Sequence, residues 1–216
     1  MRILASLLTA LLLTAGPAGA QTSNTDMFKE YIASDTHREM VKRAIATIPP
    51  RILPRCPTLV SNASRIIPMK SLSIGPDGTP NTGAWKQEFP VSGCGPATSV
   101  NLFFAATPGK GIDVVVGLLG TTHADPLLQR EAIPLVRIGA GRVTSICPEI
   151  AVAHAEFEHM GRSDGTPPPA APPGKQAWWE TWTLTGCGLT VDLVMEFAPD
   201  ATGTQILQPS SGAHLR

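Results

Sequence analysis

The chain contains the same motif in two places. Residues 85–95 read W-K-Q-E-F-P-V-S-G-C-G, and residues 178–188 read W-W-E-T-W-T-L-T-G-C-G. In each copy the alternation of side chains over the first eight residues predicts a β-strand. The Gly-Cys-Gly that follows predicts a break in the strand, because glycine adopts positive φ angles without steric cost. The motif therefore requires two similar strands, each leading into a cysteine.

The four cysteines fit the same duplication. Cys56 precedes Cys94 by 38 residues, Cys147 precedes Cys187 by 40, and a proline follows each of the two earlier cysteines. Four cysteines allow three pairings, and the repeat favours Cys56–Cys94 and Cys147–Cys187. A free redox pair and a zinc site are the alternatives. The chain has no C-x-x-C motif, and oxidation competes with zinc binding in a secreted protein, so two disulfides are the better interpretation.

The N-terminus has the pattern of a secretory signal. Arg2 gives it a positive start, residues 3–15 are apolar, and residues 18–20 form an Ala-Gly-Ala cleavage site. We therefore predict a signal peptide over residues 1–20 and a mature chain with no transmembrane segment, since no later stretch approaches the roughly 20 apolar residues that a span needs. A membrane anchor at the N-terminus is the alternative. The predicted location is periplasmic or secreted, where disulfides persist.

Helix and strand patterns recur around the motif in the same order. Apolar spacing predicts a helix over 35–48, and Asp125-Pro126 predicts the start of a second helix, which Pro134 breaks or kinks. Strands are predicted at 65–74, 85–92, 100–104 and 112–119, and again at 150–160, 178–185, 193–197 and 204–207. We therefore predict an α+β fold of two tandem repeats, each a helix followed by an antiparallel β-meander with one disulfide.

The predicted organisation is a signal peptide at 1–20, a first α+β repeat at 21–120, a second at 121–210 and a C-terminal tail at 211–216. The proline-rich run at 167–173 would by itself suggest an interdomain linker. It lies between two predicted strands of the second repeat, which favours a long hairpin loop instead. The pattern does not show whether the two repeats share one sheet.

The repeated motif also supplies the candidate binding residues. Gln87 shares a strand face with Trp85, and Glu180 lies between Trp178 and Trp182 on the corresponding face. One interpretation is an aromatic cradle with a central hydrogen-bonding group, suited to a sugar, a peptide or a cation. The other is structural, because aromatic residues at strand spacing usually belong to the core, and Glu180 could pair with an arginine.

Other polar patterns carry less weight. His154, Glu156 and Glu158 alternate on one strand and would suit a metal, but a solvated strand face has the same pattern. Residues 161–165 read G-R-S-D-G, which matches the G-x-S-x-G of serine hydrolases. A proline-rich stretch follows where that mechanism needs a helix, so we interpret this segment as a turn. We assign no catalytic residue, no metal ligand and no cofactor.

Charge and composition narrow the range of functions. Without Arg2, sixteen basic side chains face seventeen acidic ones, and no block of like charge is present. Nucleic-acid binding needs a basic patch and is not expected. His37 and His123 lie near predicted helix starts and are expected to be solvated. The leading hypothesis is a non-enzymatic exported module that binds a protein, a glycan or a small molecule, or associates with the envelope. The alternative is a secreted hydrolase with a dispersed active site.

Overall fold

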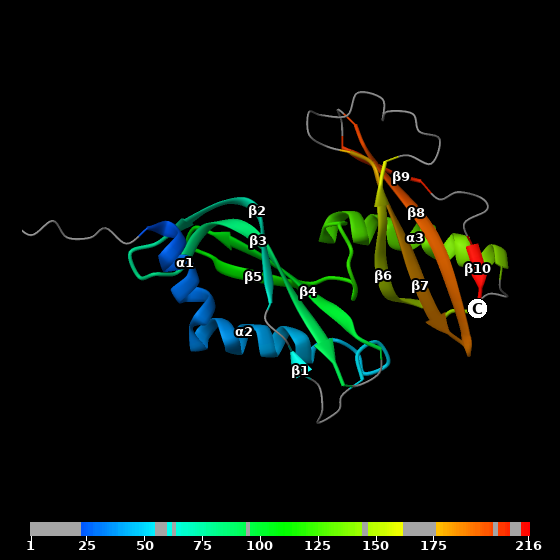
Figure 1. The fold of residues 1–216 in the computed structure, drawn as a ribbon, viewed down its shortest axis with the longest axis horizontal. Helices are drawn as coiled ribbons and strands as arrows, with labels where there is room; N and C mark the ends of the chain where they lie inside the picture. Colours follow the sequence, from blue (N-terminus) through cyan, green and yellow to red (C-terminus); the bar gives the residue numbers. More distant parts are fainter. Residues whose placement is uncertain are drawn as a thin grey trace, which may run out of the picture.

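A computed structural model describes residues 23–54, 60–61, 64–93, 96–143, 147–161, 176–200, 203–207 and 213–216. Within these residues, three helices and two antiparallel sheets form an α+β fold (Figure 1). The helices are α1 (Asn24–Ala33), α2 (Asp35–Ala46) and α3 (Pro126–Val143). The strands are β1 (Val60–Ser61), β2 (Arg65–Ile74), β3 (Pro80–Ser92), β4 (Thr98–Thr107), β5 (Gly111–Val116), β6 (Ala151–Met160), β7 (Trp178–Gly186), β8 (Leu189–Pro199), β9 (Thr204–Leu207) and β10 (Ala213–Leu215).

The first half of the molecule is α1, α2 and the sheet β2-β3-β4-β5, with β1 also pairing with β3. Ser34 caps α2 by accepting a hydrogen bond from the His37 amide over 3.2 Å. The helix ends at Ala46, two residues before its predicted end. One face of the sheet packs against both helices, in a core that contains Tyr31, Ile48, Trp85, Phe89, Val100, Leu102 and Phe104.

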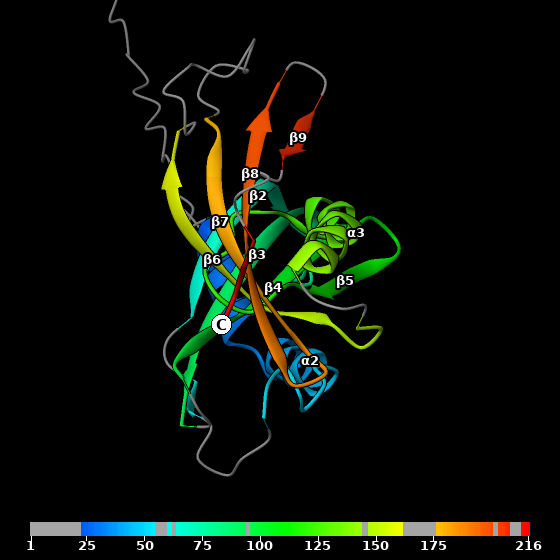
Figure 2. The same ribbon diagram turned by 90° about the vertical axis from the view of Figure 1, so that its right-hand side faces the viewer.

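The second half places α3 across the sheet β6-β7-β8, with β9 and β10 pairing with β8 (Figure 2). The predicted break at Pro134 is wrong, because α3 continues through this residue. The backbone carbonyl that loses its helical partner belongs to Arg130, which is exposed like Pro134, so water can reach it. The buried core of this half contains Ala132, Val136, Ala140, Trp182, Leu184, Leu193, Met195 and Phe197.

The second copy of the motif ends in the tight turn between β7 and β8. Gly186 pairs with Leu189, and the two residues between them have positive φ, 52° at Cys187 and 72° at Gly188. Positive φ at both central positions is the backbone of a type I′ hairpin turn. A disulfide joins Cys187 to Cys147, which confirms that predicted bridge. The other predicted pair, Cys56 and Cys94, lies outside the described residues.

The segment between the halves, residues 117–124, forms backbone hydrogen bonds with both sheets; we call it the connector. On one side, the amides of Gly117 and Gly120 donate to carbonyl groups of β4, each over 2.8 Å. On the other side, Ala155 of β6 donates to Leu119 over 2.8 Å and accepts from Thr121 over 2.9 Å. The predicted strand at 112–119 therefore ends early, at Val116, and its last residues bridge the two sheets.

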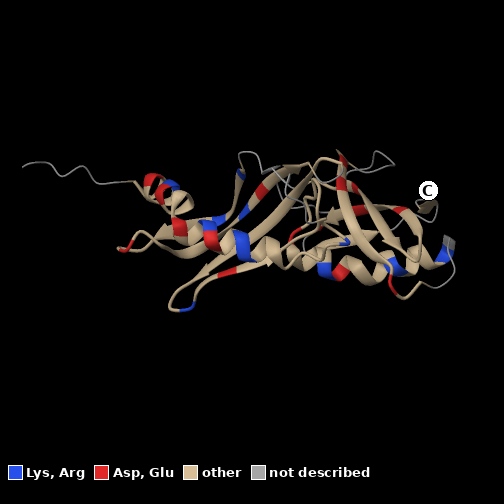
Figure 3. Ribbon diagram, turned by 90° about the horizontal axis from the view of Figure 1, so that it is seen from below, with Lys and Arg blue, Asp and Glu red and all other residues tan. Residues whose placement is uncertain are grey.

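The other predicted strands are present, but several are longer than predicted: β3 begins five residues earlier than predicted and β8 four residues earlier. The bounds of β2 and β9 are as predicted, and β6 starts one residue later. The two short strands β1 and β10 were not predicted. No described helix has the length and apolar character needed to cross a membrane. Basic and acidic residues alternate along the molecule rather than gathering by sign (Figure 3).

We predict that Gly120→Ala separates the two sheets. A Cβ at this position would lie 2.0 Å from the Ala155 carbonyl oxygen, and the φ of +102° disfavours any other residue. The expected loss is about 2–4 kcal/mol in the free energy of unfolding, measured with denaturant. Gly141→Ala is the control, because nothing lies within 4 Å of its new Cβ in α3. It should leave stability unchanged or raise it by up to about 1 kcal/mol. Equal effects of the two substitutions would contradict the prediction.

Candidate functional site

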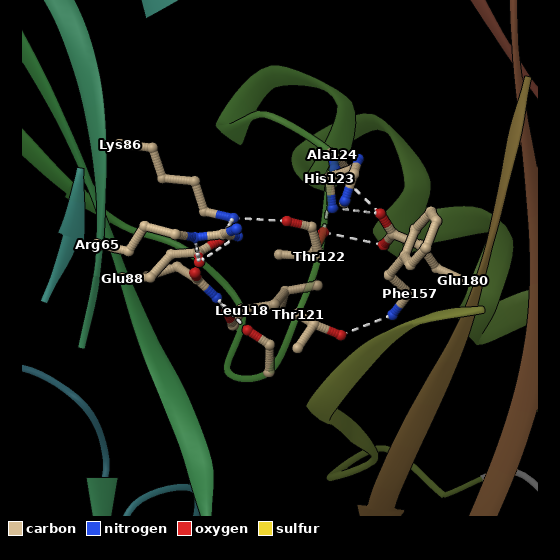
Figure 4. A network of polar contacts seen from close by, with 12 residues as sticks. Arg65, Lys86, Glu88, Leu118, Thr121, Thr122, His123, Ala124, Phe157 and Glu180 are labelled. Carbon is tan, nitrogen blue, oxygen red and sulfur yellow. Dashed lines mark hydrogen bonds and ion pairs between the residues drawn. The ribbon is translucent and has the colours of Figure 1, made fainter. Parts of the chain in front are cut away.

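The Glu180 carboxylate is completely buried and accepts five hydrogen bonds. Its donors are the Thr122 hydroxyl at 2.9 Å, the backbone amides of His123 at 2.7 Å and Ala124 at 3.0 Å, and the indole Nε1 atoms of Trp178 at 2.9 Å and Trp182 at 2.8 Å. Donors at these distances replace the water that the carboxylate gives up on burial. Glu180 therefore fastens β7 to the connector (Figure 4).

The predicted cradle residues are thus distributed over two separate cores. Trp85 and Gln87 lie in the first half, and Trp178, Glu180 and Trp182 lie in the second. All are buried except Trp178, which is half-buried. The sequence would allow an arginine as the partner of Glu180, but the five donors in the structure are all neutral groups. The placement favours the structural interpretation of the motif, because these side chains present little surface to a ligand.

Gln87 makes the corresponding contacts in the first half. Its Oε1 accepts from His37 Nε2 over 2.9 Å, and its Nε2 donates to the Ser64 hydroxyl over 2.8 Å. The expectation that His37 is solvated is wrong, because His37 is only 2% exposed. Since Gln87 Oε1 can only accept, His37 must carry its proton on Nε2. Its Nδ1 is buried without a hydrogen-bond partner, so burial lowers the pKa of His37, although the Gln87 contact acts in the opposite direction.

A charged cluster on β2 and β3 continues the polar network towards the connector. Lys86 lies 2.7 Å from Glu88, Arg65 lies 2.6 Å from the same carboxylate, and Lys86 Nζ donates to the Thr122 carbonyl over 2.6 Å (Figure 4). Burial raises the pKa of Glu88, but Lys86 and Arg65 outweigh it and hold that pKa below its ordinary value. Thr122 thus contacts Lys86 through its carbonyl and Glu180 through its hydroxyl, joining the two halves.

A groove of about 600 Å³ lies where the outer face of the second sheet meets the end of the first half. Its size is within the range of roughly 300–1,000 Å³ that is usual for ligand pockets. It is lined by Arg51, Ile52, Leu53, Pro54, Val91, Ser92, Pro96, Ala97, Thr98, Leu119, Ala153, His154, Glu156, Thr183, Thr185 and Arg216. Both halves and the connector contribute, so the groove exists only when they are joined.

The polar wall of the groove is held by contacts within the protein. His154 Nδ1 lies 3.3 Å from the Thr98 hydroxyl, and the same ring lies against Gly120, where a Cβ would be 2.6 Å from Cε1. Thr183 donates to Asp192 over 2.8 Å, and Arg216 forms an ion pair with the same carboxylate. The register of β6 against β7 shifts between Val152 and His154, the kind of bulge that often redirects side chains at functional sites.

Sequence reasoning identified His154 and Glu156 but not their setting. The groove is built from segments around residues 51–54, 91–98, 153–156 and 183–185, which no local motif connects. Among the described residues, no group of three His, Cys, Asp or Glu side chains could hold a metal ion. The G-R-S-D-G segment falls largely outside the described residues, since only Gly161 is described. His123 is exposed, as expected, and its ring stacks on Phe157 with 4.3 Å between centroids.

We predict that Glu180→Ala strongly destabilises the protein. The substitution leaves five donors without their acceptor, three of them in buried hydrogen bonds, which should lower the free energy of unfolding by about 3–5 kcal/mol in denaturant titrations. Glu158→Ala, at an exposed position of β6, is the matched control and should change stability by less than about 0.5 kcal/mol. A loss at Glu180 as small as that of the control would show that the carboxylate does not hold the connector.

We also predict that the protein is less stable in mild acid. The folded-state pKa of His37 is below its ordinary value of 6.5, so the unfolded chain takes up the proton more readily. The stability that neutral His37 contributes is fully present above pH 6.5, the ordinary pKa of histidine, and is lost as the pH falls from there through the lower folded-state pKa. Burial lowers the pKa of His123 too, so His37→Gln should reduce but not abolish the loss. Denaturant titrations at about pH 7.5 and about pH 5.5 test this, and an equal loss in both proteins would contradict it.

Comparison with protein-family models, curated proteins and solved structures gives no match for this chain. Its function must therefore be inferred from the geometry of its own residues.

Proposed function

We propose that this chain is an exported, non-enzymatic binding protein, whose ligand occupies the groove between the two halves. The observation that carries the proposal is the groove itself, a space of about 600 Å³ lined by both halves and by the connector. Its lining combines apolar residues with hydroxyl groups, a carboxylate, an imidazole and two guanidinium groups. Pockets with an apolar surface and a few fixed polar groups are typical of ligand sites.

The polar groups of the groove support binding because the protein already holds several of them in place. His154 is positioned by Thr98 and Gly120, and Thr183 by Asp192. A ligand that meets such groups does not have to supply the free energy for ordering them. We propose that the groove, rather than the buried aromatic residues of the repeated motif, is the binding surface.

We further propose that the two halves are tandem repeats of one ancestral unit. Both contain helical sequence followed by an antiparallel meander, β2 to β5 in one and β6 to β9 in the other. In both, a polar residue at the same motif position contacts the start of the helical region, through His37 in one case and through residues 122–124 in the other. A Cys56–Cys94 bridge matching Cys147–Cys187 completes this proposal, and the disulfide supports export to an oxidising compartment.

The hydrolase alternative depends on His154, which lies beside the Thr98 hydroxyl and shares the groove with Glu156. A catalytic relay needs one imidazole nitrogen on the nucleophile and the other on an orienting acid. Here Nδ1 faces the hydroxyl, whereas Nε2 lies against Gly120, where a Cβ would be 2.9 Å away. The geometry therefore favours binding over catalysis.

We predict that Ala97→Trp abolishes ligand binding without unfolding the protein. Ala97 is exposed and lines the groove, so a larger side chain fills the space without entering either core. The test is a thermal-shift screen of short peptides, oligosaccharides and small metabolites against the wild type and the variant. At least one compound should raise the melting temperature of the wild type, because ligands that bind only the native state stabilise it.

Ala105→Trp is the matched control for this experiment. Ala105, in β4, is exposed as Ala97 is, but it does not line the groove. The compound that raises the melting temperature of the wild type should raise that of Ala105→Trp by the same amount. It should not change the melting temperature of Ala97→Trp. The proposed site is wrong if the compound shifts all three proteins equally, or if no compound of the three classes shifts the wild type.

A further inference from the structure

Granted the proposed binding function, the chemistry of the groove also indicates its ligand. We propose that the groove takes a short peptide of about two residues with free ends, whose ammonium group meets Glu156 and whose carboxylate meets Arg216. Three observations support this: the separation of the two charges, the hydrogen-bonding groups between them and the kind of side chains on the lining.

The two charges lie at opposite ends of the polar wall. Glu156 is on β6, whereas Arg216 forms its ion pair with Asp192 of β8, two strands away in the order β6-β7-β8. On the central strand β7, Asp192 is opposite Thr183 and Glu156 is opposite Thr181. The two positions are therefore also offset by two residues along the strand direction. With strands about 4.8 Å apart and a rise of about 3.3 Å per residue, the backbone positions of Glu156 and Asp192 are about 12 Å apart. Two extended residues span about 7 Å, and a charged contact of about 3 Å at each end brings the total close to this separation.

The middle of the wall suits a peptide backbone. Thr183 donates its hydroxyl proton to Asp192, so its oxygen can accept a hydrogen bond from an amide N–H of the ligand. Arg51, on the opposite wall, can donate to a ligand carbonyl. A free peptide has amide donors and carbonyl acceptors along its backbone, and its two ends carry one positive and one negative charge. It therefore offers a partner to each of these groups of the groove.

The remaining lining favours a peptide over a glycan. The apolar residues of the groove are aliphatic, and the more exposed of them, Ile52, Pro54 and Ala97, can contact ligand side chains. None of the described residues that line the groove is a phenylalanine, tyrosine or tryptophan. A sugar ring would therefore find no aromatic face to stack on, although such rings are large, rigid contact surfaces.

The test uses the dipeptide Ala-Ala as the probe and isothermal titration calorimetry as the measurement. Acetylating its amino end or amidating its carboxyl end should each weaken binding to the wild type by about 3- to 10-fold, as expected for partly exposed charged contacts. Glu156→Gln should remove the effect of acetylation alone, and Arg216→Gln should remove the effect of amidation alone. Such selective losses show which end each charge contacts.

Two exposed residues outside the groove lining provide matched controls, Glu158→Gln and Arg137→Gln. Both proteins should still respond to the two blocking groups as the wild type does. The peptide proposal is overturned if Ala-Ala does not bind, or if blocking its ends has no effect. It is also overturned if an oligosaccharide binds in its place and Ala97→Trp prevents that binding; the groove would then remain the binding site. If Ala-Ala binds equally well to Ala97→Trp, the groove itself is not the site and both proposals fail.

Discussion

The fold depends on the way the connector satisfies backbone and side-chain polar groups from both halves at once. Its backbone pairs with β4 on one side and with β6 on the other, and its residues 122–124 surround the Glu180 carboxylate. A charged group without water is tolerated in a core only when such donors replace its hydration. The connector cannot leave one sheet without exposing unpaired groups on both, so the two sheets are held in one arrangement.

Because the halves are fixed relative to each other, the space between them is fixed too. The groove has one wall on the outer face of the second sheet and another on the loops of the first half, with Leu119 of the connector between them. His154 contacts both the first half, through Thr98, and the connector, through Gly120. A ligand in the groove would touch both halves, so binding and the stability of their junction should be coupled.

Much of the local structure could be predicted from the sequence because it depends on neighbouring residues. The bounds of β2 and β9 follow from side-chain alternation, and the start of α3 follows from Asp125, whose carboxylate accepts from two amides of the first turn. The Cys147–Cys187 bridge followed from comparing the two copies of the motif. The predicted break at Pro134 is wrong because the cost of a proline in a helix depends on whether water can reach the freed carbonyl, which is a tertiary property.

The sequence by itself determined the two similar strands, the helices beside them and the bridge that ties the second motif to its partner, since each is encoded by side-chain type at fixed spacing. Only the tertiary structure decided the partners of Glu180 and the lining of the groove. Three of the carboxylate's five donors lie more than fifty positions away in the chain, and two of them are backbone amides, which leave no signature in the sequence. The groove, likewise, is lined by Arg51, His154 and Thr183, which lie far apart in the sequence and come together only through tertiary packing.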